Sequence, residues 1–299
     1  MSEPLTELRC SACKRLNRVT SHSIESGRVP ICGACGERLF LGFQWGLQNA
    51  TNQIKVHQLF IGLLVVLFGA AITGLYQYPN ISISTFLFIL TFWIVSICIH
   101  EFAHAFTAFI AGEDTVVSKS YLTLNPLSYF TWNFSLILPF LIFFNGGIGF
   151  PGAAVFINRG LIQDRRWLAA VSAAGPAANV AIGFFVIWLI SISNLLSLDI
   201  TVMRALSFAA FLQIQAALFN LLPIPGLDGF GILYPFLPKA AQQTADKYAA
   251  LLSYGFFFMV FFNPTFSREL FQALFAVTDN LGIQHELIRA GYQQMRFWR

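Results

Sequence analysis

The sequence predicts an α-helical polytopic membrane protein with about six transmembrane helices, a re-entrant or interfacial β-hairpin, and a small cysteine-rich domain at its N-terminus. Hydrophobic residues make up 56% of the 299 residues and charged residues only 11%, whereas soluble domains carry about 25% charged residues. Several long apolar runs follow one another after residue 56. Most of the cysteines lie before the first run, at a spacing typical of a metal site.

Residues 1–38 form the first predicted unit. The segment "CSAC" holds Cys10 and Cys13, and "CGAC" holds Cys32 and Cys35. This spacing fits a four-cysteine zinc site, in which two tight turns each present two thiolates to one tetrahedral ion. So short a unit buries little core, and the metal would supply most of its folding energy. Two disulfides are the alternative, which a cytosolic location disfavours.

Three further regions complete the predicted organisation. Residues 39–56 are a linker, 57–283 a membrane-embedded domain, and 284–299 an interfacial amphipathic tail anchored by Trp298. The first 56 residues hold no apolar run followed by a small-residue cleavage site, so we expect no cleavable signal peptide. The net charge of +4 is modest and the basic residues are spread along the chain, which argues against a nucleic-acid partner.

The predicted membrane spans follow the apolar runs. The last two runs are shorter than the roughly 20 residues of a full crossing, and we expect them to borrow flanking residues or to thin the bilayer. The six predicted spans cover residues 57–76, 83–111, 167–190, 202–222, 248–262 and 267–283.

One more apolar run, at 134–150, is short and is broken by a proline and several glycines. Basic residues mark the cytoplasmic side of a membrane protein. If this run does not cross, sixteen of the 18 Lys and Arg residues fall on one side. A crossing would instead move Arg159, Arg165 and Arg166 to the far side. We therefore predict a re-entrant or interfacial hairpin within 116–158 that enters from the cytoplasm, with both termini cytoplasmic.

The segment "HEFAH" at 100–104 places polar residues inside an otherwise apolar predicted helix. Residues i and i+4 share one helix face, so His100 and His104 can bind one ion, and Glu101 lies near enough to hold a water on it. A charge at mid-membrane costs about 2.5–3.5 kcal/mol, which a bound cation would offset. Catalytic zinc takes three protein ligands plus water. Asp228, which follows the helix-breaking "PIPG", is the candidate third ligand.

These motifs together resemble the site-2 protease family of intramembrane zinc metalloproteases. The resemblance covers roughly residues 57–265. It rests on "HEFAH" at 100–104, "TLNPL" at 123–127, "AGPAAN" at 174–179 and "NLLPIPGLDG" at 220–229. The N-terminal cysteine unit similarly resembles a zinc ribbon, a structural or docking module that could bind a protein partner.

The family resemblance implies a zinc-dependent endopeptidase. Its reaction would hydrolyse a peptide bond in or near a transmembrane segment of a membrane-protein substrate, as in regulated intramembrane proteolysis. His100, His104 and Asp228 would hold the catalytic zinc, and Glu101 would act as general base and acid. Asn220 would lie near the substrate carbonyl and donate to the developing oxyanion. A helix-to-helix hydrogen bond is the alternative for Asn220.

The resemblance also implies the setting of this chemistry. The segment 146–158 is similar to the family segment beside the substrate, and an exposed strand edge there could hold an unwound substrate by β-addition. We expect a bacterial inner-membrane location within the lipid bilayer, with one catalytic zinc and one structural zinc in the ribbon. Asn179, in "AGPAAN", is assigned to close helix packing, and Cys98 to a small buried hydrophobe.

Two other classes of function stay open at this point. In a metal transporter, the histidines and Asp228 would pass an ion across the membrane, but a transport path needs serial sites and the sequence offers one cluster. A catalytically silent relative would only bind other spans, and the complete set of His100, Glu101, His104 and Asp228 argues against it. An aspartyl intramembrane protease needs two membrane aspartates, and only Asp228 qualifies.

Overall fold

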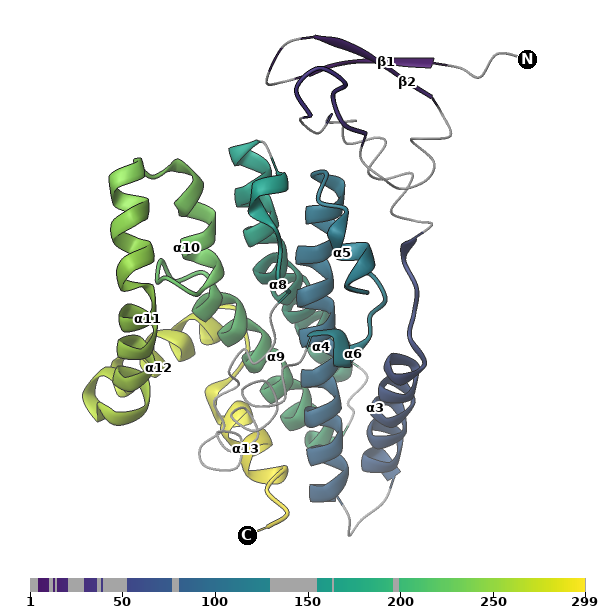
Figure 1. Cartoon of the computed structure of the whole chain (residues 1–299). Coiled ribbons are helices and arrows are strands. Elements are labelled where there is room, and N and C mark those ends of the chain that lie inside the picture. Colours follow the sequence, from purple (N-terminus) through teal and green to yellow (C-terminus); the bar gives the residue numbers. More distant parts are fainter. Residues whose placement is uncertain are drawn as a thin grey trace.

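A computed structural model describes residues 5–10, 13, 15–20, 30–36, 39, 53–76, 81–129, 155–162, 164–195 and 199–298. The described chain is mostly helical (Figure 1). Its strands are β1 (Leu5–Arg9) and β2 (Leu16–Thr20), and its short 3-10 turns are η2 (Arg159–Leu161) and η3 (Tyr234–Phe236). Its helices are α3 (Gln58–Tyr76), α4 (Ile81–Ile110), α5 (Thr115–Ser118), α6 (Pro126–Tyr129), α8 (Arg165–Leu195), α9 (Ile200–Asn220), α10 (Asp228–Leu233), α11 (Lys239–Phe262), α12 (Pro264–Asn280) and α13 (His285–Gln294).

The N-terminal unit is a two-stranded antiparallel sheet with a very small core. β1 and β2 pair in register from Leu5 opposite Thr20 to Arg9 opposite Leu16. The N–H of Leu39, the first residue of the predicted linker, donates to the Pro30 carbonyl of the unit at 2.8 Å. Among the described residues of the unit, the buried apolar ones are Cys10, Val19, Cys32 and Leu39. Two of these four are predicted metal ligands, so a bound metal would lie within this cluster.

Four of the described helices are long and apolar enough to cross a membrane: α4, α8 over Arg165–Ser193, α9 and α11. α3 contains a shorter apolar helix, Gln58–Ile72. α11 begins at Lys239, well before the predicted start at 248, and therefore gains the length of a full span. α12 corresponds to the predicted run at 267–283 but is not among the four spanning candidates. Its charged residues include Arg268, Glu269 and Asp279.

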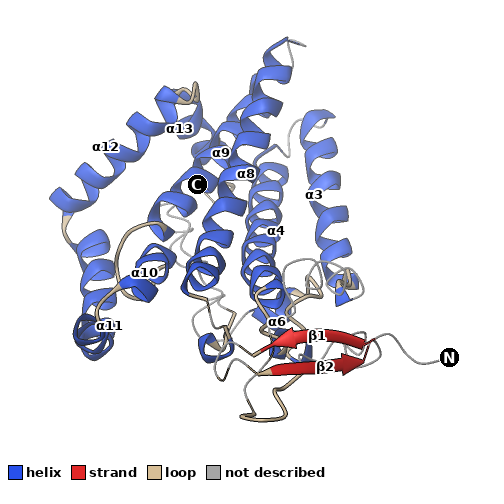
Figure 2. Cartoon of the chain, turned by 90° about the horizontal axis from the view of Figure 1, so that it is seen from above, coloured by secondary structure: helices blue, strands red, loops and turns tan. Residues whose placement is uncertain are grey.

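The bundle is built around α9, which α8 and α13 flank and α4 contacts. α3, α4, α8 and α9 stand side by side, and α11 and α12 lie on the side away from α3 (Figure 2). Asp199 caps α9, because its carboxylate accepts from the Thr201 N–H at 2.8 Å. This local hydrogen bonding to Thr201 lowers the pKa of Asp199. Ser207, Gln213 and Gln215 of α9 are fully buried, so this apolar span carries polar groups inside the protein.

The described N-terminal unit and the C-terminal helix lie at opposite ends of the bundle (Figure 1). The Gln294 side chain donates to the Thr85 hydroxyl at 2.8 Å and to the Thr201 carbonyl at 3.1 Å. Both partners lie at the N-terminal ends of their helices, whereas β1 and β2 lie near α5, which follows the C-terminal end of α4. The side of the membrane on which each terminus lies stays a prediction.

The predicted tail forms α13, a helix that packs on α9 rather than standing apart. Ile288 and Met295 are buried, and the Trp298 ring packs edge-on against Phe86 at 5.8 Å between centroids. Residues 116–129 of the predicted hairpin region are described and contain most of α5 and all of α6. Residues 130–154, which include the run at 134–150, lie outside the described residues. Residues 155–158 are described, and they run beside the site considered next.

Candidate functional site

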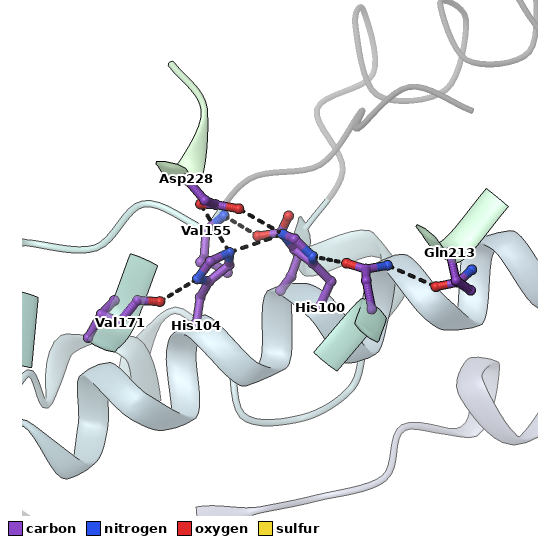
Figure 3. A network of polar contacts seen from close by, with 8 residues as sticks. His100, His104, Val155, Val171, Gln213 and Asp228 are labelled. Atoms are coloured by element: carbon purple, nitrogen blue, oxygen red, sulfur yellow. Dashed lines mark hydrogen bonds and ion pairs between the residues drawn. The ribbon is translucent and has the colours of Figure 1, made fainter. Parts of the chain in front are cut away.

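Three predicted metal ligands meet at one point (Figure 3). His100 and His104 lie one turn apart on α4, and Asp228 begins α10. The two Nε2 atoms are 3.0 Å apart, and each lies 3.3 Å from an Asp228 carboxylate oxygen. Tetrahedral zinc with bonds of about 2.0–2.1 Å places its ligand atoms about 3.3 Å apart. The spacing of the three side chains therefore fits a zinc ion.

The hydrogen bonds of the two imidazoles leave both Nε2 lone pairs facing that point. His100 Nδ1 bonds to the Asn179 side-chain oxygen, and His104 Nδ1 lies 2.6 Å from the Val171 carbonyl oxygen. Both partners are acceptors, so both Nδ1 atoms carry the proton. Two lone pairs and a carboxylate buried together repel one another unless a cation lies between them. The donor set thus fits a metal ion by its chemistry as well as its spacing.

A buried chain of hydrogen bonds orients His100 from behind. Asn179 Nδ2 donates to Gln213 Oε1 at 2.8 Å, and Gln213 Nε2 donates to the Ser96 hydroxyl at 2.9 Å. Because the Asn179 amide donates to Gln213, its oxygen is the atom that accepts from His100 (Figure 3). Such outer partners fix the tautomer and the orientation of a ligating histidine. The prediction that Asn179 serves only helix packing is therefore incomplete.

Gly175 lets α8 approach the histidine pair. A Cβ atom at this position would lie 2.2 Å from His104 Nε2 and 2.5 Å from His100 Nε2. Any side chain here would occupy the space where the ligand atoms converge. Pro176 follows inside α8 and has no N–H to donate to the carbonyl of residue 172 one turn earlier. The carbonyl of the adjacent Val171 lies beside His104 Nδ1.

The loop after α9 returns Asp228 to the end of that helix. Gly226 takes a φ of 91°, a left-handed conformation that favours glycine. Gly229 packs so closely that a Cβ would lie 2.1 Å from the Leu221 carbonyl oxygen. The Ser253 hydroxyl of α11 donates to the Pro225 carbonyl and ties the loop to the neighbouring helix. The "PIPG" break thus does what its sequence predicts, which is to turn a carboxylate inward.

Glu101 is buried beside the histidine pair, with 4% of its surface exposed. Its Oε2 accepts a hydrogen bond from the Val155 N–H at 2.8 Å. Glu101 and Asn220 also line one cavity of about 20 Å³, which has room for about one water molecule. The residues around this cavity are Trp93, Ile97, His100, Glu101, Asn179, Ala216 and Asn220.

The four N-terminal cysteines also converge. Cys10 Sγ lies 3.6 Å from Cys35 Sγ, and Cys13 Sγ lies 3.6 Å from Cys32 Sγ. Tetrahedral zinc with Zn–S bonds of about 2.3 Å separates its sulfurs by about 3.8 Å, whereas a disulfide needs about 2.05 Å. The four thiols form no disulfide with one another, and their spacing fits a metal rather than two disulfides. A hydrogen bond from the Ala34 backbone lowers the pKa of Cys32 to about 6, which favours the thiolate that binds metals.

Comparison with known proteins places the chain in a family. The model of peptidase family M50 matches residues 189–262. Rip2 of Mycolicibacterium smegmatis, which is named a zinc metalloprotease, is 38% identical to this chain over 224 residues. These residues are 74% of this chain and 84% of the relative. The chain belongs to peptidase family M50, the site-2 proteases. It is accordingly a zinc metalloprotease, a hydrolase of peptide bonds.

Further relatives agree with this assignment. Rip2 of Mycobacterium tuberculosis is 36% identical over 253 residues, covering 83% of this chain and 96% of the relative. YwhC of Bacillus subtilis, also named a zinc metalloprotease, is 30% identical over 197 residues, covering 63% of this chain and 86% of the relative. No solved structure matches the chain.

Sequence reasoning missed several residues of the site. Asn179, Gln213 and Ser96 are polar residues inside apolar spans, and that property alone could have marked them. The contributions of Val155 and Val171 come from backbone N–H and C=O groups, which every residue type offers. No sequence signal could have found those two.

Proposed function

We propose that the chain is an intramembrane endopeptidase that cleaves a membrane-protein substrate in or near a transmembrane segment, as in regulated intramembrane proteolysis. The observation that carries the proposal is the convergence of three side chains. The buried His100 Nε2 and His104 Nε2 lie 3.0 Å apart, and each lies 3.3 Å from one oxygen of the half-buried Asp228 carboxylate. It lies between helices that are apolar enough to span a membrane. In the proposal these three side chains hold the catalytic zinc.

Each residue of the site has a separate role in the proposed hydrolysis of the peptide bond. When bound, zinc supplies a Lewis acid that lowers the pKa of water in contact with it to about 7 and polarises a carbonyl oxygen. Glu101 accepts the proton of the attacking water and passes it to the nitrogen of the breaking C–N bond. Asn220, at the same cavity, donates a hydrogen bond to the oxygen of the scissile carbonyl. Asn179 and the Val171 carbonyl keep both Nε2 atoms unprotonated.

The membrane arrangement is proposed from charge and from the fold. Lys119 and Arg159 lie between the end of α4 and the start of α8, and Arg165 and Arg166 are the first two residues of α8. All four lie on the side of the bundle where Asp228 lies. Positive residues favour the cytoplasmic face, so we place the catalytic end and the cysteine unit toward the cytoplasm of a bacterial inner membrane. α3 and α12 complete six membrane-embedded helices, and 134–150 re-enters from the same side.

The cysteine unit is proposed as a zinc ribbon that carries a second, structural zinc. Its four Sγ atoms approach one another closely enough for one ion. In the proposal the unit binds a protein partner, a linker follows it, and the membrane-embedded domain over 57–283 carries the catalysis. The chain then holds two zinc ions, and only the one in the membrane-embedded domain serves the reaction.

The test replaces Glu101 with glutamine. Glu101→Gln keeps the shape of the side chain and removes the base, so zinc content should stay at two ions per chain while cleavage stops. Proteomics of cells that carry the variant should show a single-span membrane protein accumulating relative to wild type. The matched control is Glu286→Gln on α13, a glutamate in the similar segment "HELIR" that lies away from the site. If Glu101→Gln still cleaves the substrate, the proposed role of Glu101 as general base is wrong.

A further inference from the structure

The described segment 155–158 runs past the site as an extended chain. Val155 and Ile157 pack against a buried cluster, while the side chain of Phe156 is 75% exposed. Alternation of this kind is typical of an extended strand. The cluster consists of Ala105, Ala108, Phe109, Ala111, Val116, Leu122, Ile162 and Val171.

Two side chains form hydrogen bonds with the main chain of Phe156. Lys119 Nζ donates to the Phe156 carbonyl oxygen at 2.7 Å, a short bond from a charged donor. The Phe156 N–H points to the Tyr121 hydroxyl at 3.4 Å. The Lys119 ammonium also lies 5.1 Å from the centre of the Phe156 ring. Both main-chain polar groups of this residue are therefore engaged by the segment that follows α5.

The segment 119–121, which carries these two side chains, is itself held by hydrogen bonds. The Lys119 N–H donates to the Thr115 carbonyl at 3.2 Å, and the Tyr121 N–H donates to the Val116 carbonyl at 3.0 Å. The Tyr129 hydroxyl donates to the Tyr121 carbonyl at 2.8 Å. Lys119 thus extends from a rigid turn, and the position of the Phe156 carbonyl follows from that turn.

Val155 links the main chain of Phe156 to Glu101. Val155 precedes Phe156 directly, and its N–H is the group that bonds to Glu101 Oε2. Peptide planarity leaves few free rotations between the two residues. A shift of the Phe156 carbonyl therefore moves the donor that holds the Glu101 carboxylate. A displacement of about 1 Å at a reacting group can lower a rate about 100-fold.

We propose that Lys119 is a positioning residue for peptide hydrolysis: it fixes the main chain at Phe156 and, through the Val155 N–H, aims the Glu101 carboxylate. The inference rests on the proposed role of Glu101 as the base. Tyr121 assists through its hydroxyl, and its longer bond predicts a smaller effect. In the described part of the chain, no hydrogen bond or ion pair joins Lys119, Tyr121 or Phe156 to His100, His104 or Asp228. We therefore expect zinc binding not to depend on them.

The test compares Lys119→Met with Lys119→Arg, which keeps a charged donor. Lys247→Met is the matched control, because Lys247 likewise lies over a tyrosine ring, at 5.3 Å from the centre of Tyr248, but sits on α11. The purified full chain in detergent would cleave fluorescein-labelled casein, whose main chain is already extended. We expect Lys119→Met to lower kcat about 10- to 100-fold with KM and zinc content within threefold, and Lys119→Arg to restore kcat to within threefold.

Hydrogen exchange supplies a second readout that needs no substrate. Lys119→Met should speed exchange of the Val155 and Phe156 amides about tenfold or more, and Lys247→Met should not. Unchanged exchange, an unchanged kcat, or a loss of zinc and of thermal stability that Lys119→Arg does not rescue would each overturn the proposal. Glu101→Gln separates the two hypotheses: if that variant still cleaves casein the proposed mechanism fails, whereas an inactive Glu101→Gln beside a fully active Lys119→Met refutes the positioning role alone.

Discussion

Replacing Asn179 with alanine should weaken zinc binding at the membrane site without touching any ligand. The substitution removes the acceptor of His100 Nδ1 and the donor to Gln213 Oε1. Loss of such an outer partner lowers metal affinity about 10- to 100-fold, which corresponds to about 1.4–2.8 kcal/mol. Leaving a buried N–H unpaired costs about 1–3 kcal/mol, so two independent routes give the same magnitude.

The assay is zinc competition with a chelator on the purified chain in detergent. His100→Ala removes the membrane site and so defines the zinc that belongs to the cysteine unit. Gln213→Leu removes only the group that orients Asn179 and should shift the affinity in the same direction by less. Ser207→Ala is the control, since this α9 hydroxyl is buried and has no hydrogen-bond partner among the described residues. An unchanged affinity in Asn179→Ala, or an equal shift in Ser207→Ala, would refute the reasoning.

Two further predictions follow from the structure. Gly175→Ala should abolish zinc binding at the histidine pair, because its Cβ would lie 2.2 Å from His104 Nε2. Gly255→Ala is the control and should keep both zinc ions, since no heavy atom lies within 4 Å of its Cβ. Metal analysis after gel filtration measures the zinc content of both variants. The lowered pKa of Asp199 predicts that its capping contribution to α9 is present at neutral pH and is lost as pH falls through that pKa, since the unfolded chain binds its proton first. Thermal unfolding should therefore become more acid-sensitive in wild type than in Asp199→Asn, which caps without titrating; equal acid sensitivity in the two proteins would contradict this.

The helices that form the bundle were largely predictable, since their apolar runs are long and their breaks carry proline or glycine. The observed α4 and α9 each begin two residues before the prediction. α11 was underestimated because its first turns, with Lys239, Asp246 and Lys247, are polar and hide a helix that continues into the apolar run. Hydropathy finds the part of a helix that lipid surrounds, and it misses the part that extends beyond.

The location of the C-terminal helix was predicted from charge, and the structure adds its contacts within the bundle. The prediction treated the run at 267–283 as a crossing, which carried Arg289, Arg296 and Arg299 back to the basic side. In the structure, Gln294 contacts Thr85 and Thr201 at the other end of the bundle. A count of basic residues follows whatever number of crossings is assumed, so it cannot correct an error in that number. Tertiary contacts of α13 decide its place instead.

The candidate metal ligands were predictable from the sequence, but the packing and the hydrogen bonds that position them were not. Helical periodicity places His100 and His104 on one face, and an acidic residue after a proline-broken span identifies Asp228. Their convergence depends on α8 fitting closely against the pair at Gly175. The hydrogen bonds that fix the two imidazoles of α4 both come from another helix, α8. These are contacts between segments far apart in the sequence, and local patterns carry no information on them.

Anomalous X-ray scattering at the zinc edge, from crystals of the full chain, would show directly whether zinc binds between the two histidines and Asp228. We expect a peak about 2 Å from His100 Nε2, from His104 Nε2 and from an Asp228 oxygen, in addition to a peak among the four cysteines. A map with zinc at the cysteines and nothing between the histidines and Asp228, from protein that cleaves its substrate, would contradict it.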